Sequence, residues 1–139
     1  VINPYQMTEA RACGADAVLL IARIVDPATL RHLVDTARDL GMATLVETFD
    51  AADIELACQA RAEIIGINNR DLHTFEVDLA ATERLRPMIP EDRCVVALSG
   101  VHTRADSERM ARAGVHAILV AEALMTAADV TTKMRELLI

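Results

Sequence analysis

Aromatic side chains and lysine are scarce in this sequence. Tryptophan is absent, aromatic residues make up 2% of the 139 residues, and the single lysine is Lys133. Acidic residues outnumber basic ones by 21 to 14, which gives a formal net charge of −7 at pH 7. Because nucleic acids and anionic membranes are bound through basic patches, this charge argues against both as partners.

Closely spaced cysteines and long apolar runs are also missing. The three cysteines, Cys13, Cys58 and Cys94, have no close pairing, so we interpret them as packing thiols rather than as a disulfide framework or a zinc site. The histidines have no partner at metal-ligand spacing, and no apolar run approaches the roughly 20 residues that cross a bilayer. The first residues lack the features of a signal peptide. We therefore expect a cytoplasmic protein without a metal site.

What the sequence does contain is a repeat of short apolar runs. Apolar residues make up 53% of the chain, enough to exclude disorder as the main interpretation. The runs have strand length, and helix-like stretches separate them. Because they are uninterrupted rather than alternating, they predict strands covered on both faces, as in parallel sheets. The runs are Ala17–Ile24, Ala43–Val46, Ile64–Ile67, Cys94–Leu98 and Ala117–Val120.

Capping residues mark the expected helices. Asp26 followed by Pro27 supplies an N-cap and a first-turn proline, and apolar positions then recur at helical spacing until Gly41. Thr103 with Asp106 resembles a capping box before another helix. Polar residues also precede three further expected helices, namely Asp50, Asp78, and Thr126 with Asp129.

Five βα units, with a trace of another strand at Val1 and Ile2, fit two architectures. An open doubly wound sheet suits this length. A (β/α)8 barrel usually needs about 250 residues, so this chain would be a little over half of one. No interdomain linker is visible, and we expect residues 1–139 to form a single domain. Both architectures place their chemistry at the carboxyl ends of the strands.

Polar residues occur where the apolar runs end. Glu47 directly follows the second run and Asn68 the third, Ser99 and Gly100 follow the fourth, and Glu122 follows the fifth. Because side chains alternate along a strand, Glu47 and Asn68 can both face the interior of a barrel. A carboxylate and an amide would then share one mouth, which suits a small polar substrate.

These residues allow a catalytic interpretation and a structural one. Glu47 is the strongest candidate for a general acid or base, and a salt bridge to Arg23 or Arg70 is the alternative. Asn68 and Arg70 could bind a substrate carboxylate or hydroxyl. The alternative is a loop braced internally, with Asn68 bonded to the backbone and Arg70 paired to Asp71 or Glu76.

The strand-end turn at Ser99 and Gly100 also has two interpretations. Its backbone N–H groups could hold a phosphate, helped by the positive end of the helix that starts near Thr103. An ordinary strand-to-helix turn is the alternative. Glu122 would repel a phosphate that it faced, so we expect it to point away or to hold an arginine.

Several motifs, in order from one end of the chain to the other, closely resemble those of indole-3-glycerol phosphate synthase. The most specific is Gly-Ile-Asn-Asn-Arg-Asp-Leu at residues 66–72. Phosphoribosylanthranilate isomerase and the tryptophan synthase α subunit, two other phosphate-binding barrels, lack this block. The remaining motifs are Asn3–Gln6, Glu9–Arg11, Gly14–Ile21, Leu45–Glu47, Thr74–Asp78 and Ser99–Val101.

The resemblance implies an α/β fold, with about five βα units of a (β/α)8 TIM barrel of the ribulose-phosphate-binding type, from strand 3 onward. It implies a carbon–carbon lyase of tryptophan biosynthesis that needs no cofactor. Its reaction is the decarboxylating ring closure of 1-(2-carboxyphenylamino)-1-deoxyribulose 5-phosphate to indole-3-glycerol phosphate. By position, the resemblance assigns catalysis to Glu47 and substrate contacts to Asn68, Arg70, Ser99, Gly100, Ala121 and Glu122.

The chain also departs from the family. Leu98 stands where glutamate is usual, Ala121 stands where glycine is usual, and Lys133 replaces neither of the family's catalytic lysines. Losing an inward carboxylate removes a polar anchor, and an added methyl group crowds the backbone near a phosphate. We therefore expect this chain to be inactive alone, and a non-catalytic half-barrel that binds phosphate or serves in assembly is the alternative.

An incomplete barrel has two open sheet edges and an exposed apolar interior. The chain starts inside a recognisable strand of the family, so we expect it to be a piece of a longer polypeptide. The missing barrel half or a second copy would then cover the edges. Relaxation into an open sheet is the remaining possibility.

Overall fold

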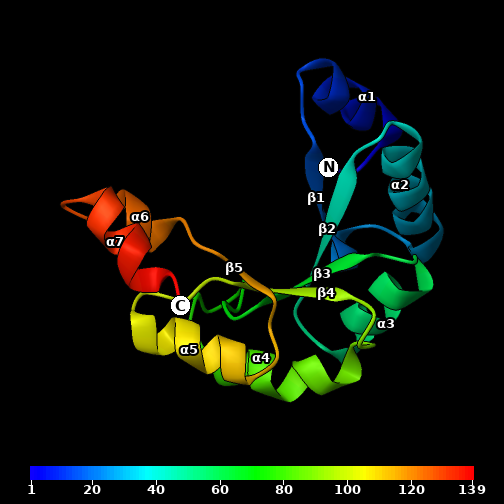
Figure 1. Cartoon of the computed structure of the whole chain (residues 1–139). Coiled ribbons are helices and arrows are strands. Elements are labelled where there is room, and N and C mark those ends of the chain that lie inside the picture. The colour runs from blue at the N-terminus through cyan, green and yellow to red at the C-terminus, as the bar shows by residue number, and fades with distance from the viewer.

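The computed structural model describes all 139 residues and contains one open, curved sheet of five parallel strands (Figure 1). Neighbouring strands pair in chain order, β1-β2-β3-β4-β5, and β1 and β5 form the two edges. A doubly wound sheet reverses its strand order part-way, so this order excludes that alternative and confirms the α/β partial barrel. The strands are β1 (Ala17–Ile21), β2 (Ala43–Thr48), β3 (Ile64–Asn68), β4 (Cys94–Leu98) and β5 (Ala117–Leu119).

Helices occupy the connections between the strands, precede β1 and follow β5, and they lie along one side of the sheet (Figure 1). None of them has the length and apolar character needed to cross a membrane. They are α1 (Pro4–Ala12), α2 (Pro27–Asp39), α3 (Ala51–Gln59), α4 (Ala80–Leu85), α5 (Arg104–Arg112), α6 (Glu122–Met125) and α7 (Val130–Leu137), with 3-10 turns at Ala22–Ile24 and Arg86–Met88.

Local capping chemistry explains where most of these helices begin. The Asp26 carboxylate accepts a hydrogen bond from the Thr29 backbone N–H at 3.0 Å, as the Asp26–Pro27 pair predicts. Thr103 and Asp106 form the predicted capping box of α5. The prediction for the last helix was wrong in one detail. Asp129 alone caps α7, whereas Thr126 is the C-cap of α6.

The first residues differ from the expectation. Val1 and Ile2 belong to no strand, because the chain enters α1 directly after them. Asn3 caps this helix by accepting from the Gln6 backbone N–H at 3.1 Å, and Pro4 occupies the first turn. The Asn3–Pro4 pair is therefore the same signal as Asp26–Pro27.

The face of the sheet that the helices cover holds the main core. Five of its strand residues are at most 1% exposed and pack against α2 and α3: Leu20, Val46, Ile65, Ile67 and Val95. Burial of these side chains is the main stabilising contribution to the fold. A smaller cluster around Met110 packs β4 against α5 and α7.

The opposite face, which we call the inner face, has buried side chains only at its central strands. Leu98 lies over Gly66, since a Cβ atom on Gly66 would be 2.8 Å from a Leu98 methyl carbon. On the two edge strands, Leu19 and Leu119 are 37% and 46% exposed. The prediction of strands covered on both faces is therefore wrong for β1 and β5, because nothing in this chain packs against their inner side.

Candidate functional site

The carboxyl ends of β2 to β5 surround a hollow of about 270 Å³, which we call the polar hollow. All seven residues that the sequence analysis singled out line this hollow, although they follow four different strands. Their roles in binding and catalysis stay predictions. They are Glu47, Asn68, Arg70, Ser99, Gly100, Ala121 and Glu122.

Glu47 and Asn68 form a hydrogen-bonded pair inside this hollow. The Asn68 side-chain Nδ2 donates to Glu47 Oε1 at 2.9 Å, and Asn68 Oδ1 accepts from the Arg70 backbone N–H at 2.9 Å. These two bonds fix the orientation of the Asn68 amide. Glu47 is 9% exposed, and its second oxygen, Oε2, makes no hydrogen bond within the protein. That oxygen is free to act on a group placed in the hollow.

The structure does not pair Glu47 with an arginine. Arg70 reaches across the hollow, where its Nη2 lies 2.8 Å from Glu122 Oε2. Glu122 therefore holds an arginine, one of the two arrangements expected for it, and Arg70 pairs with neither Asp71 nor Glu76. Because the Glu122 side chain is 61% exposed, this ion pair contributes at most about 1 kcal/mol to stability. An incoming anion can displace Glu122 from Arg70 at little cost.

The loop after Arg70 is folded on itself. The Asp71 carboxylate accepts from the backbone N–H groups of His73 at 2.7 Å and Thr74 at 2.9 Å. These hydrogen bonds from Thr74 and His73 lower the pKa of Asp71 below its usual value. An Arg70–Val77 bridge closes the loop, so the Arg70 side chain leaves from a fixed base.

Ser99 and Gly100 form a turn that only glycine permits at its second position. Both residues have left-handed backbone, with φ of 63° at Ser99 and 80° at Gly100. A Cβ atom on Gly100 would lie 2.3 Å from Val77 Cγ1. The close approach to the neighbouring loop therefore excludes a Cβ atom at Gly100, and its positive φ also favours glycine.

The helix that follows this turn is already capped. In α5, Asp106 Oδ2 accepts from the backbone N–H groups of His102 at 3.1 Å and Thr103 at 2.9 Å. A carboxylate of the chain itself thus occupies the positive end of α5. Any binding of phosphate here depends on the Ser99–Gly100 turn more than on the helix, in contrast to the sequence-based expectation.

An ionic cluster lies in the connections that follow β1 and β2. Arg23 contacts Asp50 at 2.7 Å and Asp53 at 2.6 Å, and its guanidinium lies 4.4 Å from the centroid of the Phe49 ring. Partial burial lowers the pKa of Arg23. The hydrogen bonds and charges of Asp53 and Asp50 outweigh this effect, so the pKa of Arg23 lies above its usual value. The cluster joins the connection after β1 to the connection after β2, which begins at Phe49, two residues after Glu47.

Sequence reasoning missed one residue of this region, Asn69. Its side chain is buried on the helix side and donates from Nδ2 to the carbonyl oxygens of Leu98 at 3.1 Å and Ser99 at 3.2 Å. The only available signal was alternation, which turns the side chain after Asn68 toward the helices, where a polar group needs partners.

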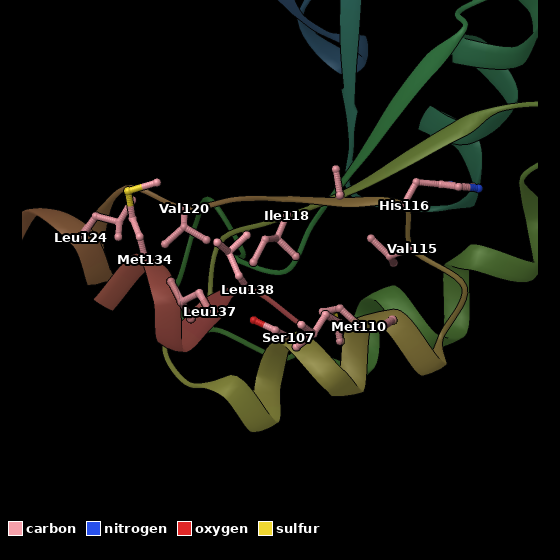
Figure 2. A pocket seen from close by; sticks show the side chains of 13 residues that line it. Ser107, Met110, Val115, His116, Ile118, Val120, Leu124, Met134, Leu137 and Leu138 are labelled. Carbon is pink, nitrogen blue, oxygen red and sulfur yellow. The ribbon is translucent and has the colours of Figure 1, made fainter. Parts of the chain in front are cut away.

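A larger hollow, of about 430 Å³, lies on the helix side between β5, α5 and α7 (Figure 2). Eleven of its 13 lining residues are hydrophobic, and Ser107 and His116 are the polar ones. It offers no carboxylate or arginine, and Nδ1 of its one titratable side chain, His116, already accepts from the Val95 backbone N–H at 3.0 Å, so it does not suit an anionic substrate. No group of three His, Cys, Asp or Glu side chains in the chain is arranged to hold a metal ion.

Comparison with known proteins agrees with the motifs. The family profile of indole-3-glycerol phosphate synthase matches residues 1–137. The chain belongs to the indole-3-glycerol phosphate synthase family. The other phosphate-binding barrels considered above are therefore excluded as its family.

Named relatives support this assignment. Indole-3-glycerol phosphate synthase of Dehalococcoides mccartyi strain 195 is 51% identical over 136 residues, which cover 98% of this chain and 52% of that protein. The multifunctional tryptophan biosynthesis protein of Schizosaccharomyces pombe is 45% identical over 138 residues, 99% of this chain and 18% of that protein. The chain thus spans about half the length of the curated indole-3-glycerol phosphate synthases that it matches.

Solved structures support the fold. 3-hexulose-6-phosphate synthase from Salmonella typhimurium superposes with a TM-score of 0.79 at 18% identity, over 99% of this chain and 67% of that one. At this identity the likeness concerns the fold alone, which is that of TIM-barrel-like enzymes.

Proposed function

We propose that the polar hollow is one side of an indole-3-glycerol phosphate synthase active site. The complete enzyme would close 1-(2-carboxyphenylamino)-1-deoxyribulose 5-phosphate to indole-3-glycerol phosphate, with loss of carbon dioxide and water. The observation that carries this proposal is the convergence of a buried carboxylate, an amide, an arginine and a glycine turn on one hollow of about 270 Å³. Family membership supplies the reaction.

In this proposal Glu47 moves the protons of ring closure and dehydration. Asn68 holds Oε1 at 2.9 Å, so the carboxylate cannot rotate freely and Oε2 keeps its direction. A fixed acid–base group within reach of the substrate contributes about 100-fold or more to the rate. The amide of Asn68 thereby acts as a support for Glu47 and as a wall of the hollow.

The anionic ends of the substrate have separate partners. We place the phosphate at the backbone of Ser99 and Gly100, beside Ala121 and Glu122. Arg70 can exchange its exposed partner Glu122 for a substrate anion, because its planar guanidinium binds an anion in two-point fashion. Net affinity for the substrate then depends on how easily Glu122 is displaced.

The 139 residues alone would not turn over the substrate. The only lysine, Lys133, lies in α7, where it contacts Glu136 at 2.6 Å and does not line the polar hollow. The lysines that the family resemblance implies are therefore not provided here. The alternative function is a non-catalytic half-barrel that binds phosphate or serves in assembly. Leu98 favours it, because an apolar side chain that is 3% exposed lines the hollow.

The two edge strands of the sheet leave surface that a further polypeptide can cover. Neither β1 nor β5 has a neighbour on its outer edge, and Leu19 and Leu119 remain exposed on the inner face. Unpaired edges with apolar side chains recruit further strands. We propose that a further barrel half, or a second copy of this chain, covers them. Light scattering of the purified chain, alone and mixed with the complementary half of the Dehalococcoides mccartyi relative, separates the two partners.

Binding of the reaction product tests the proposed site. Indole-3-glycerol phosphate is titrated into the ¹⁵N-labelled chain, and backbone amide shifts are followed by NMR. We expect the largest shifts at Asn68, Arg70 and Gly100, and a weaker effect from inorganic phosphate alone at Gly100. Shifts confined to the apolar hollow of Figure 2, around Met110 and Ile118, would refute the proposal.

A further inference from the structure

Asn69 connects three parts of the chain through its side chain. As the neighbour of Asn68 it points to the opposite face, where it is 3% exposed. Its Nδ2 donates to the carbonyls of Leu98 and Ser99, and its Oδ1 accepts from the Thr82 backbone N–H at 3.2 Å and the Thr82 hydroxyl at 2.7 Å. One buried amide thus joins the end of β3 to the end of β4 and to α4.

The hydrogen bonds allow only one orientation of this amide. The Thr82 backbone N–H can only donate, so the atom facing it must be the amide oxygen. The amide nitrogen therefore faces the two carbonyls. Thr82 is fully buried, which leaves no water to replace a lost partner.

The direction of the Ser99 carbonyl determines the direction of the next N–H. The chain contains no cis peptide bond, so the carbonyl of Ser99 and the N–H of Gly100 lie in one peptide plane and point in opposite directions within it. Because the carbonyl points to Asn69 on the helix side, the Gly100 N–H points toward the polar hollow. This N–H has no hydrogen-bond partner within the protein.

The backbone conformation of the Ser99–Gly100 turn needs contacts that hold it in place. Ser99 is not a glycine, and its φ of 63° costs about 1 kcal/mol relative to ordinary backbone. Conformations of this kind persist when the surroundings fix them. The two hydrogen bonds from Asn69 to consecutive carbonyls are the contacts that hold this peptide from the helix side.

We propose that Asn69 is a positioning residue that aims the Gly100 N–H at the substrate phosphate. Asn69 lies behind the turn and acts through the Ser99–Gly100 peptide without touching substrate. The proposal rests on the proposed function, which places a phosphate at this turn. It adds that the binding geometry of the phosphate is set from the helix side of the sheet.

The test compares three variants of the ¹⁵N-labelled chain. Asn69→Asp keeps the shape but sets a carboxylate oxygen against two carbonyls. Thr82→Val is milder, because it removes only the hydroxyl that holds Oδ1. The matched control is Thr48→Val, which removes another buried hydrogen bond, from the Thr48 hydroxyl to the Gly66 carbonyl at 2.9 Å, and leaves the turn untouched.

Two measurements are made on each protein. The residual dipolar coupling of the Gly100 N–H reports its direction, and titration with inorganic phosphate reports its affinity. We expect Asn69→Asp to change the coupling and to weaken phosphate binding about tenfold, the scale of one hydrogen bond to a charged group. Thr82→Val should change both in the same direction by less, and Thr48→Val should change neither.

The outcomes separate this proposal from the proposed function. An unchanged Gly100 coupling in folded Asn69→Asp would overturn the positioning role. If Asn69→Asp does not fold, Thr82→Val decides in the same way. If phosphate leaves the Gly100 amide of the unmodified chain unaffected, the phosphate site is wrong. A changed coupling in the variants would then still support the control of Gly100 by Asn69.

Discussion

Replacement of Arg23 by methionine should destabilise the chain, because it leaves Asp53 without its cation. The Asp53 side chain is 5% exposed, while that of Arg23 is 34% exposed. Breaking a buried ion pair costs about 3 to 5 kcal/mol, and the partial exposure of Arg23 reduces this to about 2 to 3 kcal/mol. Asp53 also accepts from the Phe49 backbone N–H at 2.9 Å, so its carboxylate cannot turn out to water without losing that bond.

Urea denaturation followed by circular dichroism measures this loss. The midpoint should move to a lower urea concentration with an unchanged slope, because the surface exposed on unfolding stays the same. Arg104→Met is the matched control. Arg104 and Glu108 are 56% and 45% exposed, so we expect a loss below about 1 kcal/mol. A loss for Arg23→Met no larger than for this control would refute the reasoning.

Three further predictions concern the site and its surroundings. Gly100→Ala should lower the free energy of unfolding by more than about 1 kcal/mol, because the added methyl carbon would lie 2.3 Å from Val77 Cγ1. A melting temperature equal to that of the wild-type chain would contradict this. Hydrogen bonds lower the pKa of Asp26 and Asp71, so their stabilisation exists above the unfolded-state pKa and disappears as the pH falls through the folded-state value. The urea concentration at the unfolding midpoint should therefore decrease as the pH is lowered below about 4. A midpoint that stays constant down to about pH 2 would be the contrary result. Glu122→Gln should strengthen phosphate binding by up to about fivefold because it frees Arg70; weaker binding in the NMR titration would count against the proposed exchange of partners.

Local signals made much of the fold predictable. The N-caps at Asp26 and Thr103 act within three residues of themselves, so the sequence contains all of the interaction. The Asn3–Pro4 cap was overlooked although it carries the same signal. The first apolar run was assigned too long a strand, because apolar character continues from β1 into the 3-10 turn at Ala22–Ile24.

The site was predictable only as far as strand ends and family motifs reach. Glu47 and Asn68 were placed together because parallel strands end at one edge of the sheet. The arginine held by Glu122 could not be named, since Arg70 is 52 positions away in the sequence. Asn69 was missed for a related reason, because its partners come from β4 and α4 and its side chain faces away from the hollow.

The central claim is that Glu47 performs acid–base chemistry at the mouth of a completed barrel. The most direct test joins this chain to the remaining residues of the Dehalococcoides mccartyi relative and measures steady-state conversion of 1-(2-carboxyphenylamino)-1-deoxyribulose 5-phosphate. Glu55→Gln, on the exposed side of α3, is the matched control. We predict that Glu47→Gln lowers kcat about 100-fold or more with little change in KM, whereas Glu55→Gln leaves kcat intact. An unchanged kcat in Glu47→Gln would contradict the account.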